Sequence, residues 1–138
     1  MKQYLFVVLL VSALVLAACG GGTSDTGGIT LNEIPAEYVG WTNPLGGDAA
    51  AIAAGKAVFE QNCVSCHGAT GLGDGEAGVA LDPPPADLHK VNELAGEDYL
   101  YFVINEGVEG TSMVAWKGAL SDEQIQQVAA YIRATFTP

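Results

Sequence analysis

Cys63-Val64-Ser65-Cys66-His67 is the stretch from which the rest of this sequence is best interpreted. Its two cysteines are three positions apart, so on a helical turn their sulfurs lie on the same side. His67 follows directly, which places an imidazole beside the same two sulfurs. Three chemistries use such a cysteine pair: a redox-active C-x-x-C, half of a zinc site, and the covalent attachment of a c-type haem.

The surrounding sequence favours haem attachment. A thioredoxin-like redox motif would need a βαβ pattern, which the sequence lacks. A structural zinc site would need a fourth strong ligand, and no cysteine remains once Cys19 is assigned to a lipid anchor. C-x-x-C-H is itself the attachment signal for haem. The motif therefore predicts one covalent haem c, bound through thioethers at Cys63 and Cys66, with His67 as a metal ligand.

Helical signals lie on both sides of the motif. Asp48 is a suitable N-cap for a helix over residues 49–62, and a second helix is expected over 96–105, ending at Gly107. The clearest helix is the last, where Ser121 and Gln124 form a capping box. Its apolar residues recur at helical spacing: Ile125, Val128, Ala129, Ile132 and Phe136.

Residues 48–138 resemble the class I cytochrome c family. The resemblance rests on the motif, on Gly55 and Phe59 on one face of the first helix, and on glycines following the motif. It implies an all-α class I cytochrome c fold, with three to five helices wrapped around one covalently attached haem c. In the family a proline carbonyl accepts the N–H of the proximal imidazole, a role that any residue of Pro83-Pro84-Pro85 could fill.

The segment Gly110-Thr111-Ser112-Met113-Val114-Ala115-Trp116 looks like the family's distal loop. The resemblance implies Met113 as the second axial metal ligand, although Val114 stands where the family usually has proline. Met113 is also the only methionine left if Met1 leaves with a leader. The rival ligand is His89, which lies in a polar stretch expected at the surface. Trp116 resembles the family's haem-pocket tryptophan, and a plain core aromatic is the alternative.

The first 18 residues are typical of an export signal. Lys2 precedes an apolar stretch that is too short to span a bilayer comfortably. It ends in Leu16-Ala17-Ala18-Cys19, which resembles the lipobox of bacterial lipoproteins. This implies cleavage before Cys19 and lipidation of its sulfur. An ordinary secretory signal or an uncleaved anchor helix is the alternative.

Three divisions of the chain follow: a signal peptide over 1–18, a lipidated tether and apolar arm over 19–47, and the cytochrome domain over 48–138. Residues 20–28 have the composition of a flexible linker. The arm, residues 29–45, contains Tyr38 and Trp41 and has no clean period. It either packs on its own domain or docks on a partner protein.

Composition narrows the function. The 138 residues carry a formal charge of -11, which argues against binding nucleic acid. The resemblance implies an electron carrier rather than an enzyme, tethered in the bacterial envelope outside the cytoplasm and exchanging single electrons with redox proteins. A fixed subunit of a larger respiratory or photosynthetic complex, quinol-oxidising or oxidase, is the alternative. A haem peroxidase or sensor would require a vacant sixth position on the iron.

Overall fold

The computed structural model describes residues 31–137, which contain five α-helices, one short 3-10 turn and no β-strand. The elements in chain order are α1 (Ala49–Asn62), α2 (Val64–His67), η1 (Gly78–Ala80), α3 (Leu88–Leu94), α4 (Glu97–Glu106) and α5 (Asp122–Thr135). The prediction of an all-α fold is confirmed. The leader, Cys19 and the linker up to residue 28 lie outside the described residues.

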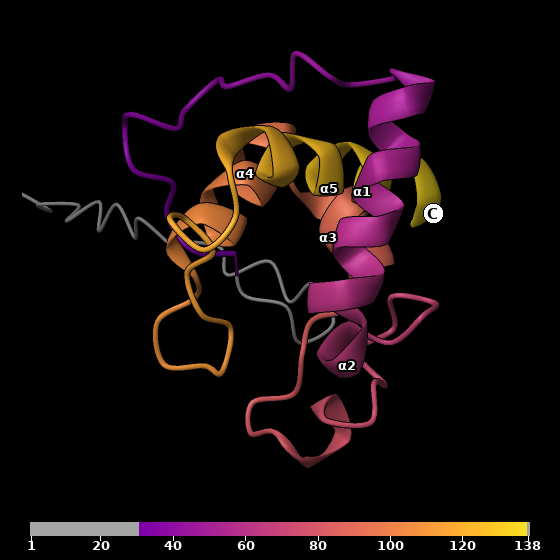
Figure 1. Cartoon of the computed structure of the whole chain (residues 1–138). Helices are drawn as coiled ribbons and strands as arrows, with labels where there is room; N and C mark the ends of the chain where they lie inside the picture. Colours follow the sequence, from indigo (N-terminus) through magenta and orange to yellow (C-terminus); the bar gives the residue numbers. More distant parts are fainter. Residues whose placement is uncertain (1–30, 138) are drawn as a thin grey trace, which may run out of the picture.

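Helices α1 and α5 cross at close range, as Figure 1 shows. The crossing is close because residue 55 is a glycine: a Cβ there would lie 2.0 Å from the carbonyl oxygen of Gln127. One turn further along α1, Phe59 is 1% exposed and its ring packs 5.4 Å from that of Tyr131. The Gly55 and Phe59 face expected from the sequence is therefore the face that α1 presents to α5.

The caps expected for these helices are present. The side chain of Asp48 accepts a hydrogen bond from the backbone N–H of Ala51 at 2.7 Å and begins α1. Ser121 and Gln124 form the reciprocal capping box that begins α5. Ile125 and Val128 on the inner face of α5 are almost fully buried. Local sequence thus sets where both crossing helices begin.

Helix α3 lies where the sequence predicted a polar surface stretch. Asp87 caps it, accepting hydrogen bonds from the N–H groups of His89 and Lys90. Its far end is fixed by Arg133 of α5, which donates to the carbonyl oxygens of Asn92 and Ala95. A helix of seven residues has too few apolar positions to produce a visible helical period.

The described part of the arm packs on its own domain. The ring of Tyr38 is buried and its hydroxyl donates to the carboxylate of Glu106 at the end of α4. Trp41 stacks on Tyr101 of α4, with ring centroids 3.8 Å apart and planes 7° from parallel. From there the arm runs on to the start of α1 (Figure 1). Of the two alternatives for the arm, packing on its own domain is the one observed.

Candidate haem site

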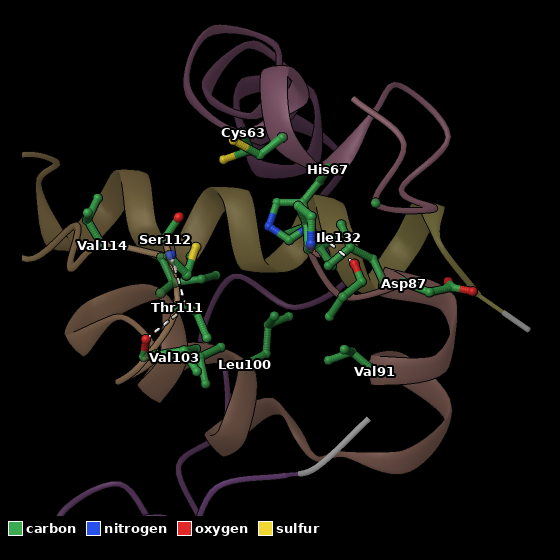
Figure 2. Close-up of a pocket in the computed structure, with 18 of the residues that line it drawn as sticks. Cys63, His67, Asp87, Val91, Leu100, Val103, Thr111, Ser112, Val114 and Ile132 are labelled. Atoms are coloured by element: carbon green, nitrogen blue, oxygen red, sulfur yellow. Dashed lines mark hydrogen bonds between the residues drawn. The ribbon is translucent and has the colours of Figure 1, made fainter. Parts of the chain in front are cut away.

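A cavity of about 780 Å³ opens between the α2 segment, α3, α4 and the loop that precedes residue 116. Its walls are mainly apolar, with Leu100, Val103 and Ile132 among the side chains drawn in Figure 2. Volumes of this order are typical of sites for cofactors and other small organic ligands. Asp87 and Lys90 are among the polar residues that line the cavity.

Cys63 and Cys66 both line this cavity. The backbone N–H of His67 donates to the carbonyl oxygen of Cys63 at 2.9 Å, which closes the single helical turn of α2. This turn brings the two sulfurs to the same side, as the spacing predicted. Burial, assisted by the neighbouring Cys66, raises the pKa of the Cys63 thiol to about 11. The thiol is therefore protonated at neutral pH.

The imidazole of His67 points into the cavity (Figure 2). Its Nδ1 donates to the carbonyl oxygen of Ala86 at 3.3 Å, because a carbonyl can only accept. Burial lowers the pKa of His67, and the bond to Ala86 opposes that shift. The neutral ring with its proton on Nδ1 leaves the lone pair of Nε2 free to bind a metal.

The acceptor for His67 is a correction to the prediction from sequence. None of Pro83, Pro84 or Pro85 accepts this bond, which goes to the next residue in the chain, Ala86. The reason is that the Pro85 carbonyl packs against Gly73. A Cβ at residue 73 would lie 2.3 Å from that carbonyl oxygen. The Pro85 carbonyl therefore faces the glycine loop, while the three prolines line the cavity with their rings or backbone.

Met113 and Trp116 reach the same cavity from the segment between α4 and α5. Both side chains are half-buried. The backbone N–H of Trp116 donates to the carbonyl oxygen of Ile104 at 3.0 Å, and that of Val108 donates to Met113 at 3.0 Å. The chain after α4 thus folds back on the end of that helix and carries the methionine to the cavity wall.

His89 is held away from the cavity. Its Nδ1 and Nε2 each lie 3.0 Å from a backbone carbonyl oxygen, those of Thr137 and Thr70 respectively. Its ring also meets the edge of Phe136, at a centroid distance of 5.6 Å. The neighbours Leu88 and Lys90 line the cavity. The ring of His89 thus joins the glycine loop to the C-terminal segment.

Several residues at the cavity were not identified from the sequence. Tyr99 lines it from α4 and accepts a hydrogen bond from the backbone N–H of Asn32 in the arm, at 3.4 Å. Leu72 and Val114 line it as well, and they are 53% and 62% exposed. The two residues of this hydrogen bond, Asn32 and Tyr99, are 67 positions apart in the sequence, and no local pattern predicts their contact. The arm therefore forms part of the cavity wall.

The donor set fits a covalently attached haem. Two thiols on one helical turn, a neutral imidazole and a thioether line a single apolar cavity. Soft thioether and imidazole ligands suit haem iron, and apolar walls suit a porphyrin. Within residues 31–137, no three His, Cys, Asp or Glu side chains gather to hold a metal ion on their own.

The family model described as "cytochrome c oxidase, cbb3-type, subunit III" matches residues 50–132, which is more than half of the chain. The chain belongs to this family of c-type cytochromes. Haem c is accordingly its covalent cofactor. The family match begins within α1 and ends within α5, so it covers every residue of the cavity wall except Asn32 of the arm.

The chain is similar to subunits of cbb3-type oxidases and to cytochromes c6. The CcoP subunit of the cbb3-type cytochrome c oxidase of Azospirillum brasilense is 37% identical over 99 residues, covering 70% of this chain and 32% of that protein. Cytochrome c6 of Thermosynechococcus vestitus is 34% identical over 84 residues, covering 61% of this chain and 70% of that protein. The match thus spans about a third of the CcoP sequence and most of cytochrome c6.

Solved structures support the same fold. The reducing HAO-like protein complex of Kuenenia stuttgartiensis aligns with a TM-score of 0.58 at 22% identity, covering 83% of this chain and 49% of that chain. Cytochrome cL of Methylophaga aminisulfidivorans aligns with a TM-score of 0.56 at 20% identity, covering 80% and 72% respectively. The helices of this chain are therefore arranged as in known c-type cytochromes.

Proposed function

We propose that this protein transfers single electrons between redox partners outside the cytoplasm, as a membrane-tethered cytochrome with one haem c. In this proposal Cys63 and Cys66 form the thioethers, His67 is the proximal ligand and Met113 is the distal ligand. The observation that carries it is the meeting of these four side chains at one apolar cavity. Family membership and the relatives named above support it.

When bound, the haem supplies a one-electron couple. The protein's own contribution would be two ligands to the iron, His67 and Met113, which would leave no open position there for a substrate. His67 is oriented through its bond to Ala86, which also keeps its Nε2 unprotonated. A thioether from Met113 favours the reduced state and raises the reduction potential. The mainly apolar walls would shield the bound haem from water.

The ligand assignment is tested with two variants of the mature haem protein. Met113→Ala should abolish the absorption band that arises from methionine bound to ferric haem and should lower the reduction potential measured by redox titration. His89→Ala is the matched control and should change neither property. If the effects were exchanged between the two variants, ligation by two histidines would replace the present assignment.

The tether is the second element of the proposal. We assign Cys19 as the lipidated residue, which would hold the domain at the outside of the bacterial membrane through residues 20–28. No helix within residues 31–137 has the length and apolar character needed to cross a membrane. Cys19→Ser should release a soluble protein that still carries haem. Retention in the membrane fraction would point instead to an uncleaved helix or to tight docking.

A fixed subunit of a larger electron-transfer complex is the second candidate function. The match to the subunit III family and to CcoP favours it. Gentle detergent extraction distinguishes the candidates, because a subunit co-purifies with a stoichiometric complex whereas a free carrier elutes alone. A peroxidase or sensor would need an open sixth position, so rapid binding of cyanide to the ferric protein would favour that function over both.

A further inference from the structure

A ring of hydrogen bonds joins Met113, Thr111 and Val108. The carbonyl oxygen of Met113 accepts from the N–H of Val108 at 3.0 Å, and the N–H of Met113 donates to Oγ1 of Thr111 at 3.0 Å. The hydroxyl of Thr111 in turn donates to the carbonyl oxygen of Val108 at 2.8 Å. The dashed lines at Thr111 in Figure 2 mark the contacts of this hydroxyl.

The hydroxyl of Thr111 is the one side-chain group in this ring of hydrogen bonds. It acts as acceptor and donor at once, because it accepts from the N–H of Met113 and donates to the carbonyl oxygen of Val108. The remaining bonds are between backbone groups, including a longer one of 3.2 Å from the N–H of Thr111 to Val108. Replacing the hydroxyl with a methyl group would therefore leave the N–H of Met113 without its partner.

Side-chain packing contributes little to holding this loop, so its hydrogen bonds matter more. Thr111 and Val114 on either side of Met113 are exposed, so little packing holds them. Val114 is also free to sample backbone angles that a proline at this position would forbid. On the inner side, Gly107 approaches so closely that a Cβ there would lie 2.6 Å from the carbonyl oxygen of Met113.

We propose that Thr111 is the positioning residue for the distal ligand: its hydroxyl holds the backbone of Met113 so that the thioether stays directed into the cavity. This inference rests on the proposed role of Met113 as a ligand. It predicts that the hydroxyl controls how readily Met113 is displaced by a competing ligand. Ser112 has no such role, although it is also polar, exposed and lines the cavity.

The test is an imidazole titration of the ferric haem protein. Binding is measured as the loss of the methionine absorption band. Thr111→Val should raise the affinity for imidazole about fivefold, the factor that corresponds to the net contribution of one hydrogen bond. Thr111→Ser keeps the hydroxyl and should restore the affinity to within about twofold of the unmodified protein. Ser112→Ala is the matched control and should also stay within that range.

Each outcome supports or overturns a defined claim. If the unmodified protein shows no methionine band, Met113 is not a ligand, and the proposed ligation fails together with this inference. If the band is present and Thr111→Val binds imidazole like the unmodified protein, the role of Thr111 is wrong while the ligation stands. An equal rise in imidazole affinity in Thr111→Ser and Thr111→Val would also refute the role of the hydroxyl. Thr111→Ala carries the same prediction should the valine variant fail to fold.

Discussion

The close crossing of α1 and α5 predicts a large loss of stability for Gly55→Ala. The new Cβ would lie 2.0 Å from the carbonyl oxygen of Gln127 and 2.5 Å from its carbon. Ordinary contact begins near 3.4 Å, so the helices would have to separate by more than 1 Å. The obstructing atoms belong to backbone and cannot rotate aside.

Two opposing effects set the magnitude. Overpacking of a buried contact costs about 1–3 kcal/mol, and the upper end applies here because the neighbours are backbone atoms. Alanine is preferred over glycine within a helix by about 1 kcal/mol, which offsets part of that cost. The net expectation is a loss of about 2 kcal/mol in the free energy of unfolding. In a domain of this size such a loss lowers Tm by about 10 °C.

The assay is urea unfolding of the oxidised haem protein, followed by far-ultraviolet circular dichroism. Ala57→Gly, at an exposed position of the same helix, measures the propensity effect alone and should cost about 1 kcal/mol. The two variants separate propensity from packing. A Gly55→Ala protein that is as stable as the unmodified protein, or more stable, would refute the close crossing.

Three further predictions concern His89, Glu106 and Gly107. The pKa of His89 should lie above its ordinary value of about 6.5, because both ring nitrogens donate to the carbonyl oxygens of Thr137 and Thr70 only when the ring is protonated. The stability from this contact is complete at low pH and is lost as the pH rises through the raised pKa. The urea midpoint of the unmodified protein should therefore fall over that pH interval. The midpoint of His89→Gln should not fall there. Nuclear magnetic resonance titration of the ring protons measures the pKa directly, and a value below 6 would contradict the two bonds. Tyr38→Phe should raise the pKa of the Glu106 carboxyl towards its ordinary value, because the phenol is the largest of the groups that lower it, whereas Val39→Ala should leave that pKa unchanged. Gly107→Ala should weaken the methionine absorption band, since both the positive φ of 77° and the contact with Met113 disfavour a side chain there.

The sequence predicted those parts of the fold that depend on local signals. The capping residues of α1 and α5 were identified because a cap acts within one turn of its own helix. The common location of Cys63, Cys66 and His67 at one cavity follows from helical spacing alone. Met113 and Trp116 were associated with the same cavity through a family resemblance, since no local rule brings residue 113 to residue 67.

Other features depend on contacts between distant segments. The choice of Ala86 over a proline as the partner of His67 is decided by the packing of Pro85 against Gly73, which no local pattern encodes. The sequence of the arm shows no hydrophobic period because each aromatic residue makes a separate contact. Tyr38 bonds to Glu106, and Trp41 stacks on Tyr101. Tertiary contacts of this kind override weak local preference.

The central claim is that haem is joined covalently to Cys63 and Cys66. The most direct test is to denature the mature protein, extract it with acidified organic solvent, and analyse the digested polypeptide by mass spectrometry. We expect the peptide containing residues 63–67 to retain the mass of one haem and the organic layer to remain colourless. Free haem in that layer, with an unmodified peptide carrying two thiols, would contradict it.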